Sequence, residues 1–256
     1  MTISVNSGEV KPGTANVWWL GQGSVVFEGP HSGPLVIDPY LSDSCGAGGG
    51  PRRLNPVPVA PCDLQVAAIF LTHDHQDHTD PETLPELCIA NPEAPIYAPL
   101  ESIAHLERLG IHGPRVNRLE RGQRVSLPGV TVHAVHAEHT DDSVGLIFVF
   151  EDGPTIYHTA DTEYFDHIGE EAATLGIDLM TICINGRWGN MGIPEAVKVT
   201  QTVNPAEVLP MHWGLFSENT ADPQEFISQL QATSSLAKPI LLEPHGHGRY
   251  TVSRRR

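Results

Sequence analysis

The chain has 256 residues, 40% hydrophobic and 18% charged, an ordinary composition for a globular protein and long enough to bury a sizeable core. Its formal net charge of −16 argues against nucleic acid as a substrate, because an acidic surface repels phosphate backbones. The longest apolar run, near residues 144–150, is far shorter than the about 20 residues of a membrane helix. The first ten residues lack the pattern of a secretory signal, so we expect a cytoplasmic protein.

The chain is predicted to begin with three short strands, at 16–20, 24–28 and 35–38. Gly21-Gln22-Gly23 separates the first two, and glycine-centred turns between closely spaced strands favour an antiparallel meander. A loop rich in glycine and proline follows at 42–62. Loops of this length are often functional, so we expect this one at the mouth of a site.

The next part of the chain mixes strands and helices. Residues 66–71 form a continuous apolar run, which is typical of a strand buried on both faces. Asp80-Pro81 is typical of the start of a helix, which we expect to end near residue 90. We then predict strands at 96–98, 115–118, 123–126, 129–137, 143–151 and 154–159, and a helix at 100–109.

The C-terminal part again alternates between helices and strands. We predict helices at 163–175, 194–203 and 223–232, and strands at 178–184, 207–210, 239–243 and 249–252. In each half of the chain, strands come first and a mixture of strands and helices follows. This order predicts two β-rich halves packed as a sandwich with helices outside, in one domain over residues 1–256.

The four cysteines, at positions 45, 62, 88 and 183, show no C-x-x-C spacing. Their spacing argues against a disulfide framework and against a cysteine-rich zinc site. Cys88 and Cys183 lie in apolar stretches and are interpreted as core residues.

The segment THDHQDHTD, residues 72–80, packs three imidazoles and three carboxylates into nine positions. Held in a cleft, these are the ligands that zinc, manganese or iron prefer. His73 and His75, two apart in extended backbone, point the same way and can share one metal. Asp77 and His78 lie beyond a turn and can reach a second. A helix cap with incidental histidines is the weaker interpretation.

Further candidate ligands lie at or just past the ends of predicted strands, where loops converge on a site in α/β architectures. They are His133, His136 and His139 at the end of the strand 129–137, Asp161 after the strand 154–159, and His212 after the strand 207–210. Strand ends explain how positions so far apart in the chain can meet.

The sequence resembles the metallo-β-lactamase superfamily in four features taken together. They are T-H-D-H-Q-D-H at 72–78, a histidine that ends a strand, T-A-D-T at 159–162 and P-M-H at 210–212. The resemblance covers about residues 15–250 and implies an α/β protein with an αββα four-layer sandwich, two mixed β-sheets with helices outside. Within the superfamily, the chain resembles the branch that contains L-ascorbate-6-phosphate lactonase. The segments that carry this resemblance are INGRWGNM at 184–191, HWGLF at 212–216 and DPYLS at 38–42.

The resemblance also implies a set of metal ligands. His73, His75 and His139 would hold a first metal, and Asp77, His78 and His212 a second, with Asp161 between them. The turn of the family usually reads G-D-T, whereas here Ala160 stands in place of the glycine, which leaves its backbone angle open. The branch is associated with manganese, sometimes as a single ion. We therefore expect one or two divalent ions, Mn²⁺ or Zn²⁺.

The expected function is that of a lactonase that opens a small, anionic, sugar-derived lactone by attack of a metal-bound hydroxide, with Asp77 and Asp161 as the catalytic carboxylates. A phosphodiesterase or phosphoesterase with the same metals is the first alternative, because fold and ligands do not fix the scissile bond. A non-catalytic metal-binding interaction protein is the second. The partner would be a small-molecule substrate, with no nucleic acid and no membrane. Lactonases that the chain resembles form homo-oligomers, and the same assembly is an open expectation here.

Four residues are candidates for substrate binding. Asn185 and Arg187 follow the strand 178–184 and should face the metals. An arginine fork suits a phosphate or carboxylate, with an ordinary salt bridge as the alternative. Trp213, like Trp188, either walls the pocket or packs in the core. His136 either lines the pocket or is a hydrogen-bonded structural histidine.

Several supporting residues are left with two interpretations. Asp38 and Asp80 are candidates to orient a ligand imidazole, and Asp80 is equally suited to cap the helix that follows it. His133 and His158 are interpreted as structural or exposed. His245 and His247 are interpreted as surface or rim residues.

Overall fold

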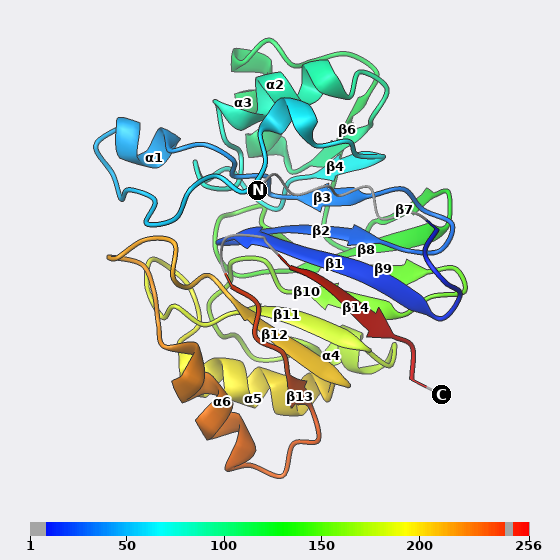
Figure 1. The fold of residues 1–256 in the computed structure, drawn as a ribbon, viewed down its shortest axis with the longest axis vertical. Coiled ribbons are helices and arrows are strands. Elements are labelled where there is room, and N and C mark those ends of the chain that lie inside the picture. Colours follow the sequence, from blue (N-terminus) through cyan, green and yellow to red (C-terminus); the bar gives the residue numbers. More distant parts are fainter. Residues whose placement is uncertain (1–8, 244–247, 256) are drawn as a thin grey trace.

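The computed structural model describes residues 9–243 and 248–255. Two β-sheets face each other in it (Figure 1). The first sheet contains, in spatial order, β14 (Arg249–Ser253), β1 (Thr14–Gly21), β2 (Ser24–Glu28), β3 (Leu35–Ile37), β4 (Ala68–Phe70), β5 (Ile96–Ala98) and β6 (Val116–Arg118). The second contains β13 (Lys238–Pro239), β12 (Glu207–Met211), β11 (Leu179–Cys183), β10 (Thr155–His158), β9 (Val144–Phe150), β8 (Val130–His136) and β7 (Arg124–Leu127).

Both sheets are mixed. In the first sheet β1, β2 and β3 pair antiparallel, which confirms the predicted meander, and β3 to β6 pair parallel. In the second sheet β7 to β10 pair antiparallel and β10 to β13 pair parallel.

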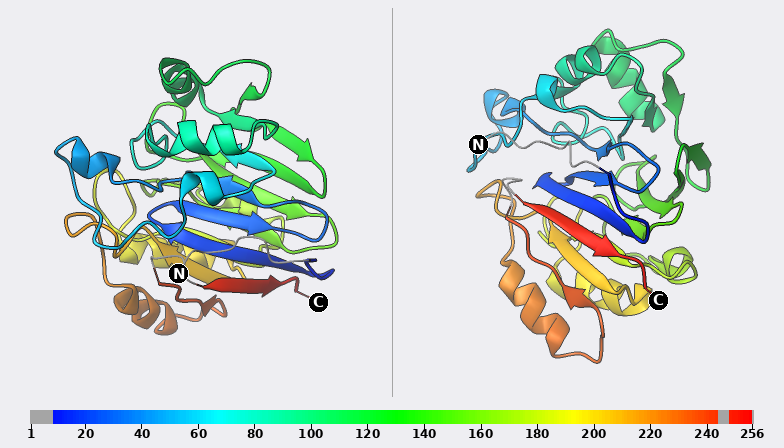
Figure 2. Two further views of the ribbon diagram at one scale, coloured as in Figure 1. Left: turned by 45° about the horizontal axis from the view of Figure 1, so that its top comes forward. Right: turned by 45° about the vertical axis from the view of Figure 1, so that its right-hand side comes forward.

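Helices cover the outer faces of both sheets (Figures 1 and 2). The helices α2 (Thr83–Ala90) and α3 (Leu100–Arg108) lie on the side of the first sheet, and the 3-10 helix η1 (Pro61–Asp63) contacts α2. The short helix α1 (Ser44–Ala47) lies apart from them, beyond the ends of the strands. The helices α4 (Glu170–Ala173), α5 (Ile193–Val203) and α6 (Pro223–Gln231) lie on the side of the second. The predicted four-layer sandwich is therefore confirmed.

Strand β1 shows why the layers form. Val17 and Trp19 pack between the sheets, against residues of the second sheet such as Phe148. Trp18 and Leu20 point to the opposite face, where they join the cluster beneath α2 and α3. Because successive side chains of a strand point to opposite faces, a continuous apolar strand must be covered on both sides.

Three sequence-based predictions of secondary structure were wrong in extent. Of the helix predicted at 163–175 only α4 forms, because His167 (φ 75°) and Gly169 (φ 83°) adopt left-handed backbone that a right-handed helix cannot continue through. Helix α2 begins at Thr83, whereas the sequence predicted Asp80 as its cap and Pro81 as its first residue. The strand predicted at 239–243 is only the two residues of β13. Cys88 and Cys183 are buried, as predicted.

Both sheets deliver the candidate ligands to one edge of the sandwich. Asp38 follows β3, His73 to His78 follow β4, His139 follows β8, Asp161 follows β10 and His212 follows β12. Since β3 and β4 run parallel in one sheet and β10 to β12 in the other, their carboxyl ends meet at a common edge. No helix in the described part of the chain has the length and apolarity to cross a membrane.

Candidate metal centre

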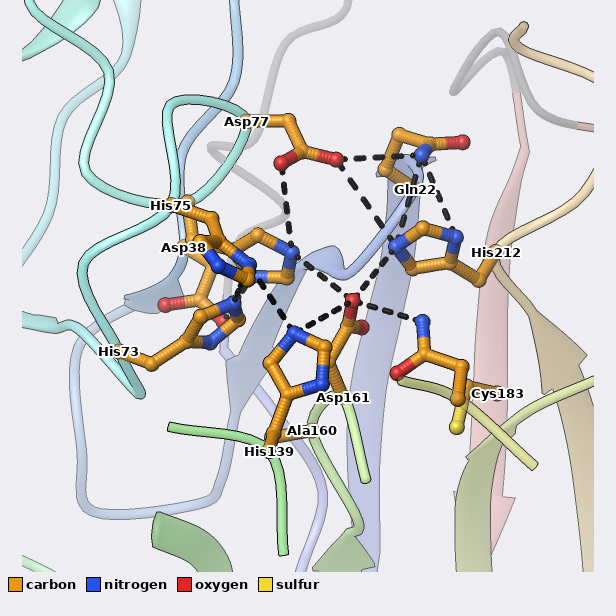
Figure 3. Close-up of polar contacts among 12 residues, drawn as sticks. Gln22, Asp38, His73, His75, Asp77, His139, Ala160, Asp161, Cys183 and His212 are labelled. Carbon is orange, nitrogen blue, oxygen red and sulfur yellow. Dashed lines mark hydrogen bonds and ion pairs between the residues drawn. The ribbon is translucent and has the colours of Figure 1, made fainter. Parts of the chain in front are cut away.

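The predicted ligands gather in two groups of three (Figure 3). Ligand atoms of His73, His75 and His139 lie within 4.8 Å of one another, and so do ligand atoms of Asp77, His78 and His212. These are the two sets that the resemblance assigns to a first and a second metal; their role as metal ligands stays a prediction. We call them the first set and the second set.

Asp161 lies between the two sets. Its Oδ2 is 2.9 Å from Nε2 of His212 and 3.5 Å from Nε2 of His78, both in the second set. The same oxygen is 3.8 Å from Nε2 of His139, in the first set. One carboxylate can therefore serve both sets, as a bridging ligand does.

The first set is oriented by contacts behind its rings. Nδ1 of His139 donates to the carbonyl oxygen of Gly189 at 2.7 Å, which leaves Nε2 free to face the centre. There, Nε2 of His139 lies 3.0 Å and Nε2 of His73 lies 3.1 Å from Nδ1 of His75. Three ring nitrogens thus point to one place, which is the geometry that imidazole ligands of a shared ion require.

The second set is oriented by Asp38. Its Oδ2 lies 2.8 Å from Nδ1 of His78, so Nε2 of His78 faces the other ligands. Asp38 also accepts hydrogen bonds from the backbone N–H of Thr72 at 2.8 Å and from its hydroxyl at 2.6 Å. The prediction that Asp38 orients an imidazole is confirmed.

Asp80 caps the helix that follows it, which is one of the two roles predicted for it. Its carboxylate accepts hydrogen bonds from the hydroxyls of Ser42 (2.7 Å) and Thr83 and from the backbone N–H of Glu82 (3.1 Å). It therefore fastens the start of α2 to the 42–62 loop and contacts no imidazole of the centre.

Gln22, a residue that the sequence analysis treated only as part of a turn, belongs to the centre. Its Nε2 donates to Oδ2 of Asp77 at 3.2 Å and lies 3.3 Å from Nδ1 of His212 (Figure 3). The available signal was a polar side chain between two glycines in an otherwise apolar hairpin. Gly23 has a steric role as well, because a Cβ there would lie 2.7 Å from Cε1 of His78.

The T-A-D-T turn has left-handed backbone at its alanine. Ala160 has φ 59°, the left-handed region where glycine is usual. Asp38 (φ 46°) and His212 (φ 63°) share this conformation, which concentrates backbone strain around the centre.

The buried charges of the centre stabilise one another. Burial lowers the pKa of His73 well below its usual value, and burial lowers the pKa of His75 too. Burial also disfavours charge on His78, but the nearby carboxylates, Asp161 first, raise its pKa well above the usual value. Burial alone would raise the pKa of Asp161, yet the imidazoles of His212 and His78 hold it well below its usual range. The shifts of His73, His75 and Asp161 favour the neutral imidazoles and the ionised carboxylate that bind metals, whereas His78 would have to release a proton when a metal binds.

Two buried atoms indicate that the centre fits a metal ion. Nε2 of His78 and Oδ1 of Asp161 have no hydrogen-bond partner among the described residues, and a buried polar atom without a partner costs free energy. His78 belongs to the second set, and Asp161 lies between the two sets. With only nitrogen and oxygen donors, the residues fit a divalent ion such as Mn²⁺ or Zn²⁺.

The centre opens into a pocket of about 110 Å³. Its walls are formed by residues of the 42–62 loop, both ligand sets and the loops after β11 and β12: Cys45, Pro51, His75, Asp77, His139, Asp161, Trp188, Asn190, His212, Phe216 and Asn219. No lysine or arginine within residues 9–243 and 248–255 lines this pocket. The 42–62 loop does lie at the mouth of the site, as expected from the sequence.

Two of the four predicted substrate-binding residues follow β11 but do not line this pocket. Asn185 is buried, and its Nδ2 donates to Oδ1 of Asn219 at 2.7 Å, so it supports the wall from behind. Arg187 is exposed. Positive φ angles at Gly186 (64°) and Trp188 (52°) reverse the chain on either side of Arg187, so that Trp188 rather than the arginine reaches the wall.

The other two pack elsewhere. Trp213 packs against Trp19 with ring centroids 5.2 Å apart and ring planes tilted by 44°. Its Nε1 donates to the carbonyl oxygen of Pro210 at 3.0 Å, and the side chain packs partly buried against the core, which is the core role. Nε2 of His136 lies 2.9 Å from Oε2 of Glu138, and the residue lines a separate cavity of about 460 Å³. Of the two interpretations of His136, the structure agrees with the hydrogen-bonded histidine and not with the residue that lines the pocket of the centre.

His133 and His158 are members of neither ligand set. His158 is fully buried with Nδ1 2.9 Å from the hydroxyl of Thr181, and His133 is buried with Nδ1 3.9 Å from Glu171. The structural interpretation of both is confirmed. His245 and His247 lie outside the described residues.

Comparison with known proteins agrees with the fold and the ligand pattern. The Beta-lactamase superfamily domain matches residues 35–213, a range that spans all the predicted ligands from His73 to His212. The chain belongs to the beta-lactamase superfamily. A UPF0173 metal-dependent hydrolase of Polaromonas sp. is 30% identical over 254 residues, covering 89% of this chain and 88% of that protein.

Two solved structures are similar over almost their whole length. Igni18, a metallo hydrolase from the archaeon Ignicoccus hospitalis, superposes with a TM-score of 0.73 at 24% identity, covering 94% of this chain and 100% of that one. The metallo-beta-lactamase fold protein YhfI from Bacillus subtilis superposes with a TM-score of 0.70 at 15% identity, covering 93% and 99%. The predicted metallo-β-lactamase fold is thereby confirmed, while the narrower resemblance to the lactonase branch stays a prediction.

Proposed function

We propose that this protein is a metal-dependent hydrolase that opens a small lactone. The observation that carries the proposal is a partly buried centre of histidines and carboxylates that opens into a pocket of about 110 Å³ without a cationic wall. Pockets for drug-sized ligands measure about 300–1,000 Å³, so this one suits a compact ester. The resemblance of the segments 184–191 and 212–216 to the lactonase branch supports a cyclic ester.

The ligand sets would divide the work in the following way. His73, His75 and His139 would hold one ion and Asp77, His78 and His212 another, with Asp161 between them. A divalent ion, when bound, supplies Lewis acidity that activates water and polarises an ester carbonyl.

Two carboxylates of the chain have distinct tasks in this proposal. Asp161 stays ionised, because the imidazoles of His212 and His78 lower its pKa. Asp77 lines the pocket, and its Oδ2 accepts a hydrogen bond from Gln22. We assign to Asp77 the relay of a proton: it would take up the proton that the attacking water loses and give it to the leaving alkoxide as the ring opens.

The lining of the pocket favours an uncharged lactone over the anionic one expected from the sequence. Recognition of a phosphate or carboxylate usually employs arginine or lysine, and Arg187 is exposed and outside the lining. The net charge of −16 also disfavours an anionic substrate at long range.

The test is hydrolysis of a substrate panel by metal-free protein reconstituted separately with Mn²⁺ and Zn²⁺. The panel contains γ-butyrolactone, δ-valerolactone, a phosphorylated sugar lactone and bis-p-nitrophenyl phosphate. Metal-dependent opening of the uncharged lactones is the expected result, and it would identify the working ion. Cleavage of the phosphodiester alone would replace the lactonase proposal by the phosphodiesterase. Stoichiometric metal binding without turnover of any substrate would indicate the non-catalytic alternative, and light scattering of the same samples would test the expected homo-oligomer.

A further inference from the structure

His139 reaches the first set from a loop of the second sheet. The loop, residues 137–143, connects β8 to β9, and the antiparallel pairing of these strands ends at His136 and Val144. Strand pairing therefore does not fix the loop itself. Nε2 of His139 nevertheless lies 3.0 Å from Nδ1 of His75, which follows a strand of the other sheet. The position of the loop backbone thus decides whether the first set can form.

The guanidinium of Arg121 closes the base of this loop. Its Nε donates to the carbonyl oxygen of Ser143 at 3.0 Å, and its Nη2 donates to those of Ala137 at 3.0 Å and Thr140 at 3.3 Å. Ala137 and Ser143 are the next pair beyond the end of the β8–β9 ladder. Arg121 therefore continues the connection between the two strands where their own pairing stops.

Arginine is suited to this task by its shape. The guanidinium is a rigid, planar fork whose nitrogens can donate to separate carbonyl oxygens at once, whereas the ammonium of lysine is a point charge on a flexible stem. Arg121 lies in the 119–123 connection between β6 of the first sheet and β7 of the second. The carbonyl oxygens that it binds precede and follow His139 in the chain, so one side chain holds both limbs of the loop.

The two limbs of the loop have further anchors on different sides of the sandwich. Before the ligand histidine, the carbonyl oxygen of Glu138 accepts a hydrogen bond at 2.8 Å from the N–H of Glu163, which follows β10 of the second sheet. After it, the carboxylate of Asp142 accepts at 3.0 Å from the N–H of Glu101 in α3, on the side of the first sheet. The guanidinium joins the two limbs that these anchors hold apart.

We propose that Arg121 is a positioning residue that holds His139 in place for the first metal. The inference rests on the ligand assignment of the proposed function. Without the fork the limbs of the loop separate, and Nε2 of His139 withdraws from Nδ1 of His75. The second set contains no residue of the 137–143 loop, so its ligands keep their places.

Arg115 supplies a matched control, because it has the same chemistry elsewhere in the fold. Its guanidinium donates to the carbonyl oxygens of Cys88, Asn91 and Pro92, at 3.4, 2.8 and 3.2 Å, at the end of α2. None of these residues belongs to a ligand set. Replacing either arginine by lysine removes a fork from three backbone carbonyls, so the two variants should lose similar thermal stability.

The experiment is competition between metal-free protein and a fluorescent chelator for Zn²⁺. Arg121→Lys should weaken zinc binding by about tenfold, as the loss of support behind a ligand does, whereas Arg115→Lys should bind zinc as the wild type does. In a His139→Ala background, Arg121→Lys should cause no further loss, because the ligand through which it acts is absent. If a lysine variant does not fold, Arg121→Gln and Arg115→Gln serve for the same comparison.

Wild-type zinc affinity in Arg121→Lys would overturn the inference. Equal losses in Arg121→Lys and Arg115→Lys would also overturn it, because they would reflect general destabilisation, and so would a loss that persists in the His139→Ala background. Wild-type zinc affinity in His139→Ala alone would remove the ligand assignment and the inference together. Failure of every lactone to open refutes only the lactonase proposal, because zinc affinity is measured without a substrate.

Discussion

Replacing Asp38 by asparagine should weaken metal binding at the second set by about 10–100-fold, the usual loss when a partner behind a ligand imidazole is removed. Oδ1 of Asp38 accepts from the N–H of Thr72, and Oδ2 accepts from its hydroxyl and lies 2.8 Å from Nδ1 of His78. The amide of asparagine has only one oxygen, so its NH₂ group must replace either Oδ1 or Oδ2 of Asp38. If the NH₂ group replaces Oδ2, Nδ1 of His78 must accept a hydrogen bond from it. The ring proton of His78 then moves to Nε2, the atom that faces the other ligands.

The backbone should tolerate this change, because Asp38 has φ 46° and asparagine is enriched in left-handed backbone. Competition with a fluorescent chelator measures the affinity of each bound ion. Asp80→Asn is the matched control, since Asp80 is an equally buried carboxylate that binds Ser42 and Thr83 and no imidazole. Equal losses of metal affinity in the two variants would refute the reasoning, because they would reflect general destabilisation rather than the orientation of His78.

Three other changes test the centre and its surroundings. Gly23→Ala should lower metal affinity, because the new Cβ would lie 2.7 Å from Cε1 of His78, and chelator competition that shows wild-type affinity would contradict this. Burial lowers the pKa of His158 to about 4 from 6.5, so its stabilising effect is complete above pH 6.5 and is lost as the pH falls toward 4. Urea unfolding of the metal-free protein measures this effect. Between about pH 7 and about pH 5, the free energy of unfolding should fall by about 2 kcal/mol more for the wild type than for His158→Gln. Equal falls in the two proteins would rule the effect out. Arg187→Ala should keep kcat/KM for an uncharged lactone within about twofold of wild type, as exposed residues usually do, while a loss confined to a phosphorylated lactone would restore its anion-binding role.

The convergence of the candidate ligands could be predicted from the sequence because their pattern is local. His73 and His75 stand two residues apart after an apolar strand, and Nε2 of His73 lies 3.1 Å from Nδ1 of His75, so the two rings meet as predicted. Residues Ser24–Glu28 were predicted with their observed bounds, since glycine turns mark where the strand starts. Where identity and spacing determine the structure, sequence reasoning is sufficient.

Contacts made by distant packing could not be predicted in this way. Gln22 reads as a turn residue, and its contact with His212, 190 positions away, exists only because β12 ends beside the β1–β2 turn. The direction of Arg187 depends on two left-handed residues that flank it, one of which is a tryptophan. Local patterns assign such backbone to glycine, so the reversal at Trp188 had no signal in the sequence.

Each ligand set takes residues from both sheets of the sandwich. His75 follows β4 of the first sheet and His139 follows β8 of the second; His78 and His212 are divided in the same way. A bound ion would therefore cross-link remote parts of the chain and close long loops, as a disulfide does. The free energy of ion binding then contributes to the stability of the whole sandwich rather than to that of one loop. In a cell, the supply of the metal would set how long this protein survives proteolysis as well as whether it is active.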